Sequence, residues 1–284
     1  MPMPIREKGY YNWEGQLKTS PVKWLPIFVN GIKSVYKKKF SKLLFATSAF
    51  PFLIFLIAVY VATKPELKMM TRLVKEIQND ALLFNTYYTN GFLIFMMVIM
   101  GLFAGAELIS NDLKYKSFTF YLSRPLSRLD YLKGKFSIVL FYLLAFTLVP
   151  GLLLILAKII FSGEFSVSLN ILLAAIIFPI VISLFLGSLS IMLSSLSSNS
   201  RFAMVMIFVV YVMSNAIAQM FHGIFKNTSF LFLSFDSNIR NFGKFIFGTQ
   251  GEFYTHGFVS GCILVGLTIL FFVIIMMRIK RVEV

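Results

Sequence analysis

The chain has 284 residues, of which 58% are hydrophobic, 17% aromatic and only 14% charged. Soluble domains carry about 25% charged residues, so this composition excludes a soluble fold and predicts an integral membrane protein. The formal net charge of +15 would suggest nucleic-acid binding in a polar protein. In a membrane protein it is explained by basic cytoplasmic loops, and no nucleic-acid partner is expected.

Residues 1–42 form a basic arm with nine Lys or Arg, and the long apolar runs begin only after it. No cleavable signal peptide is therefore expected. From Trp24 to Phe40 apolar residues recur at helical spacing, and the lysines lie mainly off that stripe. This pattern predicts an amphipathic helix in the cytoplasmic interface, attracted to anionic lipid, with a plain basic anchor as the alternative. The stripe consists of Leu25, Phe28, Val29, Ile32, Val35, Tyr36 and Phe40.

Six later windows are apolar over the roughly 20 residues that cross a bilayer. None of them contains Lys, Arg, Asp or Glu, and a charge at mid-membrane costs roughly 2.5–3.5 kcal/mol on insertion scales. The sequence therefore predicts an all-α integral membrane protein with one six-helix transmembrane domain over residues 43–284, preceded by the arm over residues 1–42. The windows are Leu43–Ala62, Tyr87–Ala106, Phe136–Ala157, Ile171–Leu193, Phe202–Phe221 and Phe258–Met277.

Six spans place both termini on the same side of the membrane. Of the 27 Lys and Arg residues, 19 lie on that side and eight on the other. The positive-inside rule then predicts that both termini are cytoplasmic. We expect a multi-pass protein of the cell (plasma) membrane.

Two loops on the outer side have a character of their own. Thr63 followed by Pro65 is a helix-start signal, and the apolar spacing after it predicts a short surface helix that reaches Ile77. The loop from His222 to Gly257 is long and rich in Phe. It favours short helices that dip partway into the outer leaflet, because irregular backbone at that depth must be shielded.

Two glycine pairs at i and i+4 lie in or next to the spans. Gly101 and Gly105 occur in the second window, and Gly257 and Gly261 occur at the start of the last. This spacing permits close approach of two helices. We interpret both pairs as packing inside the chain, with a dimer contact as the alternative.

Enzymatic motifs are missing. Gly134-Lys135 lacks the upstream glycines of a phosphate-binding loop, and His222 and His256 are interpreted as packing residues at helix ends. Cys262 is the one cysteine, which excludes a multi-cysteine metal site. We expect no catalytic residue, metal site or cofactor on this chain. The windows also contain no carboxylate, which argues against an ion-coupled transporter.

The loop from Ala106 to Phe136 carries the most information. Ser110 or Asn111 can cap a new helix, with Asp112 in its first turn, and Pro125 ends the run. The pattern predicts a short surface helix over about Asp112–Leu122. Its aromatic residues, Tyr115, Phe118 and Tyr121, would be anchors for a partner, and its basic residues would be polar contacts.

With Glu107 before it, the segment "YLSRPLSRLDYLKGK" resembles the signature loop of the type-2 ABC exporter permease family. Members typically have a Glu at the end of a span, a short helix, a Ser-Arg-Pro-hydroxyl-Arg turn and a Tyr-Leu-x-Gly-Lys lead into the third span. The close match covers the loop from Glu107 to Lys135, and the six-span layout agrees over the whole chain. One departure is Asn111–Lys116, where many members have an acidic-basic-Gly stretch.

The resemblance implies that Asp112–Leu122 is a coupling helix, which docks into a cleft of a separate ATP-binding cassette ATPase. The loop Ser194–Arg201 would be the second contact. The alternative is that the basic residues only fix topology, which leaves the aromatic residues and Pro125 unexplained. The residues expected to couple the chain to the ATPase are Glu107, Asp112, Lys114, Tyr115, Lys116, Phe118, Tyr121, Arg124, Arg128, Ser197 and Arg201.

The predicted function is that of the membrane-spanning permease subunit of an ABC exporter. It would form the translocation pathway as a homo- or heterodimer in membrane lipid, while ATP and Mg²⁺ bind the partner ATPase. The chain itself would not be an enzyme. The alternatives are a membrane-embedded lipid-processing enzyme, against which the missing acid–histidine clusters argue, and a non-transporting membrane scaffold.

Overall fold

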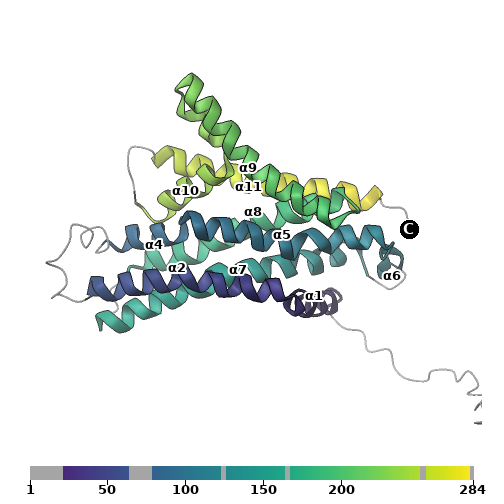
Figure 1. The fold of residues 1–284 in the computed structure, drawn as a ribbon, viewed down its shortest axis with the longest axis horizontal. Helices are drawn as coiled ribbons and strands as arrows, with labels where there is room; N and C mark the ends of the chain where they lie inside the picture. Colours follow the sequence, from purple (N-terminus) through teal and green to yellow (C-terminus); the bar gives the residue numbers. More distant parts are fainter. Residues whose placement is uncertain (1–21, 64–78, 123–125, 164–166, 250–253, 282–284) are drawn as a thin grey trace, which may run out of the picture.

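The computed structural model describes residues 22–63, 79–122, 126–163, 167–249 and 254–281, and in these ranges the regular structure is helical, with no strand. Long helices run side by side along one axis, and shorter helices lie at the two ends (Figure 1). In chain order the helices are α1 (Leu25–Lys37), α2 (Lys39–Thr63), α4 (Asp80–Tyr88), α5 (Gly91–Lys114), α6 (Phe118–Leu122), α7 (Arg128–Ser162), α8 (Leu169–Leu196), α9 (Ser200–Phe225), η2 (Thr228–Leu233), α10 (Phe235–Ile246) and α11 (Tyr254–Arg281).

The described residues contain six segments that are long and apolar enough to cross a membrane. Each predicted window falls on one of them, so the six-span, all-α fold is confirmed. Both α1 and the last turn of α11 lie at one end of the bundle, which we call the terminal end, and α4 and α10 lie toward the other (Figure 1). The six segments are Lys39–Val61, Asp80–Lys114, Arg128–Ser162, Leu169–Leu196, Ser200–Phe225 and His256–Arg281.

The second span consists of two helices, α4 and α5, so the predicted span over 87–106 contains a helix break near its start. The side-chain oxygen of Asn90 accepts hydrogen bonds from the backbone N–H groups of Phe92 (2.9 Å) and Leu93 (3.3 Å). This is the geometry of a helix N-cap, and it begins α5 directly after α4. The three residues Thr89, Asn90 and Gly91 are too few to lower the mean hydropathy of this window enough to reveal the break.

The amphipathic helix is confirmed as α1, which lies across the axis of the bundle at the terminal end (Figure 1). It packs on α7, where the tyrosine hydroxyl of Tyr142 donates a hydrogen bond to the carbonyl oxygen of Ile32 (2.7 Å). Val35 is buried, whereas Leu25 and Val29 are exposed. The predicted apolar stripe is thus divided between α7 and an exposed face that suits lipid.

Close packing of α5 on α8 forms the centre of the bundle. A Cβ at Gly105 would lie 2.6 Å from the Cβ of Ser190, and one at Gly101 would lie 3.0 Å from its hydroxyl oxygen. The second pair, Gly257 and Gly261, faces α10. The interpretation of both pairs as packing inside the chain is confirmed, because in each case the neighbour belongs to the same chain.

Beyond α9 the predicted short helices are present as η2 and α10. Aromatic stacking joins α10 to α8, with ring centroids of Phe242 and Phe178 6.0 Å apart. The guanidinium of Arg240 donates to the carbonyl oxygen of Thr89 (2.9 Å) at the break between α4 and α5. The other outer helix, predicted to begin at Thr63, falls almost wholly on 64–78, outside the described residues.

Candidate functional site

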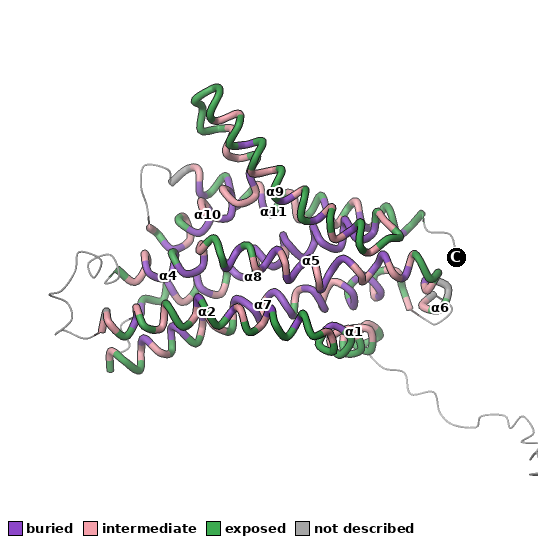
Figure 2. The backbone as a smooth tube through the Cα atoms, viewed as in Figure 1, coloured by how far each residue is buried: buried purple, intermediate pink, exposed green. Residues whose placement is uncertain are grey.

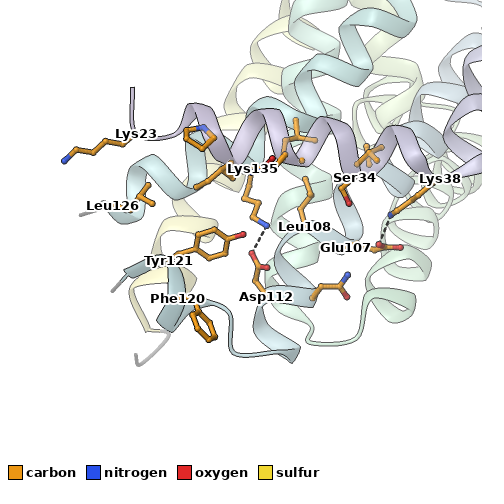
Figure 3. Close-up of a pocket in the computed structure, with 18 residues that line it drawn as sticks. Lys23, Ser34, Lys38, Glu107, Leu108, Asp112, Phe120, Tyr121, Leu126 and Lys135 are labelled. Atoms are coloured by element: carbon orange, nitrogen blue, oxygen red, sulfur yellow. Dashed lines mark hydrogen bonds and ion pairs between the residues drawn. The ribbon is translucent and has the colours of Figure 1, made fainter. Parts of the chain in front are cut away.

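A cavity of about 670 Å³ opens at the terminal end, where α1, α5, α6 and α7 meet. Figure 3 shows side chains from these four helices around it, including both members of two ion pairs. The walls combine apolar side chains such as Ile27 and Leu108 with charged side chains such as Lys38 and Glu107. Residues of the predicted loop 107–135 and of the interfacial helix therefore line the same cavity.

The first ion pair joins α5 to the junction of α1 and α2. Lys38 is the extended residue between those two helices, with ψ of 124°, and its ammonium nitrogen lies 2.7 Å from a carboxylate oxygen of Glu107. Both side chains are about one-third exposed. Since exposed pairs contribute at most about 1 kcal/mol, this pair orients α1 more than it stabilises the fold.

The second ion pair joins the end of α5 to α7 and is nearly buried. The ammonium nitrogen of Lys135 lies 2.7 Å from Asp112, with 9% and 12% of the two side chains exposed. The hydroxyl of Tyr131 donates a hydrogen bond to the same carboxylate (2.6 Å). A buried charge is tolerated only when it is paired and hydrogen-bonded, so the three side chains form one unit, which we call the Asp112 cluster.

The end of α5 differs from the predicted helix over Asp112–Leu122. Asp112 lies in the last turn of α5, and Ser110 donates its hydroxyl to the carbonyl oxygen of Ala106 (2.5 Å) inside the helix instead of capping a new one. The prediction is wrong here because Lys135 and Tyr131 of α7 hold the Asp112 side chain, so its turn belongs to the end of α5. The separate helix α6 begins at Phe118.

Between α5 and α6 the backbone makes a Schellman turn. The N–H of Ser117 bonds to the carbonyl oxygen of Asp112 (2.9 Å), and that of Lys116 bonds to Leu113 (3.4 Å). Lys116 has φ of 53°, in the left-handed region that a helix end of this kind requires and that glycine usually occupies. Because a lysine stands there, the usual glycine signal for the end of α5 is missing from the sequence.

The aromatic residues of this loop divide into two groups. Phe118 is 4% exposed, and its ring centroid lies 4.8 Å from that of Tyr131. Tyr121 also packs on Tyr131, at 5.2 Å, and burial together with the charge of Asp112 raises the pKa of its hydroxyl. The exposed aromatic residues are Tyr115 (67%) and Phe120 (77%).

Phe120 was not among the predicted site residues. It lies on the side of the one-turn helix α6 opposite Phe118 and Tyr121, so only the position of Tyr131 reveals which side faces outward. Sequence spacing contains no signal for this choice.

The other predicted site residues are spread over the terminal end. Lys114 and Lys116 are exposed, and Arg124 falls in 123–125, outside the described residues. Arg128 donates from Nη1 to the carbonyl oxygens of Ile279 (3.2 Å) and Lys280 (2.7 Å) in the last turn of α11.

The second predicted contact is the turn between α8 and α9. Ser197 accepts a hydrogen bond from the N–H of Asn199 (3.0 Å), and the side chain of Asn199 caps Arg201 at the start of α9 (3.1 Å). This turn is attached to α11 through Arg278, which donates from Nε to the carbonyl oxygen of Ser195 (3.4 Å).

Among the residues that the structure describes, no group of three His, Cys, Asp or Glu could hold a metal ion.

The six segments of the described residues that are long and apolar enough to cross a membrane define a multi-pass membrane protein. Residues 32–284 match the family described as ABC-2 family transporter protein. The match covers most of the chain, so this protein belongs to the ABC-2 transporter family and is a permease. Permeases of this family generally work with ATP-binding subunits. No curated protein matches the chain.

Proposed function

We propose that this permease is the membrane-spanning subunit of an ABC exporter and that a separate ATPase acts on it through the loop 107–135. The observation that carries the proposal is the Asp112 cluster. It attaches the last turn of α5 to α7 by a buried ion pair, while Tyr115 and Phe120 stay exposed beside it. A partner that holds these two side chains would move α5 and α7 together.

The mechanical link is short. Phe118 and Tyr121 of α6 pack on Tyr131 of α7, and Tyr131 bonds to Asp112 of α5. Packed interiors do not deform continuously, so a displacement of α6 is passed to both spans rather than absorbed. ATP and Mg²⁺ would bind the partner, and this chain would supply the pathway.

A second permease chain, identical or related, would complete the pathway. Supporting this, α9 leans away from the bundle and is mostly exposed along its outer half (Figures 1 and 2). Its exposed side combines apolar residues such as Val212 with the small residue Ala216 and the polar residue Gln219. Small and polar side chains favour helix association in a membrane, and lipid alone gives no reason for a glutamine there.

The test is co-purification with an ATPase from the native membrane. We expect the wild-type chain to retain an ATP-binding cassette ATPase, and the double variant Tyr115→Ala/Phe120→Ala to lose roughly tenfold in affinity for it, as expected when two aromatic contacts worth about 1.4 kcal/mol together are removed. The control is Phe258→Ala, which truncates an exposed aromatic residue of α11 far from the terminal end. A wild-type chain that purifies alone and is indifferent to ATP would contradict the proposal.

A further inference from the structure

The ends of four spans are joined at the terminal end by side chains that bond to neighbouring backbones. The hydroxyl of Ser194 on α8 donates to the carbonyl oxygen of Ala106 (2.7 Å) and accepts from the N–H groups of Ile109 and Ser110 (3.1 Å each). Ser194 is fully buried. The end of α8 is therefore fixed to the end of α5, which the Asp112 cluster fixes in turn to α7.

The last turn of α11 extends this chain of contacts from α7. Its final carbonyl groups have no partner within their own helix, and the guanidinium of Arg128 supplies donors to two of them, those of Ile279 and Lys280. A cation at this position also interacts favourably with the negative end of the helix dipole. Arg128, which lies in the predicted coupling loop, is thus hydrogen-bonded to α11.

The same turn of α11 also reaches α8. Arg278 donates from Nε to the carbonyl oxygen of Ser195, one residue before the end of α8. Ile275 and Ile279, one turn apart on the same side of α11, are both buried. The contacts α5–α7, α7–α11, α11–α8 and α8–α5 form a closed ring.

We infer that the last turn of α11 is a strut that holds the loops 107–135 and 194–201 in a fixed relation, with Arg128 and Arg278 as its positioning residues. The two loops are the contacts that the proposed function assigns to the ATPase, and in that respect the inference rests on it. In a closed ring, a displacement of either loop moves the other, so the ATPase acts on four spans as one body.

The strut is tested on the chain alone by distances between paired spin labels. In a Cys262→Ala background, the labels are attached at Leu129→Cys, Leu196→Cys and Lys280→Cys, which are exposed sites on α7, α8 and α11. We expect narrow distance distributions for the pairs 129–280 and 196–280. Arg128→Gln should broaden the first, and Arg278→Gln the second, by about twofold, since each change removes a charge-assisted hydrogen bond.

The matched control is Arg281→Gln, which removes the same charge from the same turn and should broaden neither distribution. Arg128→Lys should restore the narrow 129–280 distribution, because an ammonium group still donates to the two carbonyl oxygens. Equal widths in the Arg128→Gln, Arg278→Gln and Arg281→Gln variants would overturn the strut.

The consequence for coupling is tested in the complex with the co-purified ATPase. Adding ATP, Mg²⁺ and vanadate should leave the 129–196 distance unchanged in the wild type and shift it in Arg278→Gln. A wild-type shift as large as that of the variant would overturn the inference. If no ATPase co-purifies with the wild type, the proposed function fails, while the distances in the chain alone still decide whether the strut exists.

Discussion

Asp112 and Lys135 form an ion pair in which the nitrogen and oxygen atoms lie 2.7 Å apart, although each side chain is almost inaccessible to solvent. The pair connects the last turn of α5 to the first turns of α7 across the segment that contains α6. The ring centroids of Tyr121 and Tyr131 lie 5.4 Å and 5.5 Å from the ammonium nitrogen, so the lysine has one anionic and two aromatic neighbours. The end of α5, the start of α7 and α6 therefore meet at one buried charge pair.

Removing one member of this pair should lower the free energy of unfolding more than removing both members. Lys135→Met leaves the carboxylate of Asp112 buried without its cation, and we expect the free energy of unfolding to fall by ~3–5 kcal/mol. The double change Asp112→Leu/Lys135→Met leaves no buried charge, so its loss should be smaller. Unfolding in detergent with increasing denaturant measures both.

The matched control for this pair is Lys133→Met, because Lys133 is an exposed lysine of the same helix. We expect its unfolding free energy to stay within about 0.5 kcal/mol of the wild type. A Lys135→Met protein as stable as the control would show that the pair is not buried as described.

Hydropathy and charge segregation were sufficient to predict the six spans, and helical periodicity was sufficient for α1. These signals are spread over whole helices, so no single residue can hide them. The end of α5 depends instead on one turn, and Lys116 occupies the left-handed position there without a glycine to mark it. The geometry of this turn is decided by the contacts of Asp112 with Lys135 and Tyr131 of α7, which sequence spacing does not contain.

The candidate site shows the same division. The loop 107–135 could be located from its motif, but the side of α6 that faces outward could not. Phe118 and Tyr121 turn inward because Tyr131 lies beside them, and the role of Arg128 at α11 depends on a residue 151 positions away. Contacts between distant residues are fixed by the tertiary fold and leave no local pattern.

Packing of α5 on α8 predicts that Gly105 tolerates no side chain. In Gly105→Val the Cβ would lie 2.6 Å from that of Ser190, and we expect a loss of about 1–3 kcal/mol in unfolding free energy from overpacking. Adding Ser190→Gly to the same chain should restore part of the lost unfolding free energy, because it removes the Cβ that the valine would contact. Thermal unfolding of the single and double variants measures the rescue.

Gly266 is the control for this substitution, since nothing lies within 4 Å of a Cβ added there. Gly266→Ala should be neutral or slightly stabilising, because alanine favours a helix over glycine by roughly 0.5–1 kcal/mol. Failure of Ser190→Gly to improve the Gly105→Val protein would argue against the contact.

The sidedness of the membrane spans is predicted from charge alone and can be checked by labelling. In a Cys262→Ala background, Lys133→Cys lies at the terminal end and Lys244→Cys lies on α10, and both sites are exposed. If the termini are cytoplasmic, a membrane-impermeant thiol reagent added to intact cells should label Lys244→Cys and not Lys133→Cys. In permeabilised cells the reagent should label both cysteines. Labelling of Lys133→Cys and not Lys244→Cys in intact cells would show that the topology is the reverse of the predicted one.

Arg240 is expected to hold the break between α4 and α5. Its guanidinium donates to the carbonyl oxygen of Thr89 and to the carboxylate of Asp236 (2.7 Å), so it satisfies a carbonyl that the break leaves outside regular helix bonding. Arg240→Gln removes the charge and shortens the reach, and we expect a cost of about 1–3 kcal/mol at this site. Hydrogen exchange of the backbone amides from Gly91 to Leu93 should become faster as the start of α5 opens more often.

Lys244 provides the comparison for Arg240, because it lies one turn further along α10, carries the same charge and is exposed. Lys244→Gln should leave exchange at Gly91–Leu93 unchanged. Since Asn90 caps α5 independently of Arg240, the Arg240→Gln protein should still fold, and the effect should be confined to the first turn of α5 and to α10. Faster exchange throughout α5 would instead mean that the cap and the arginine act as one unit, and unchanged exchange would remove Arg240 from any role at the break.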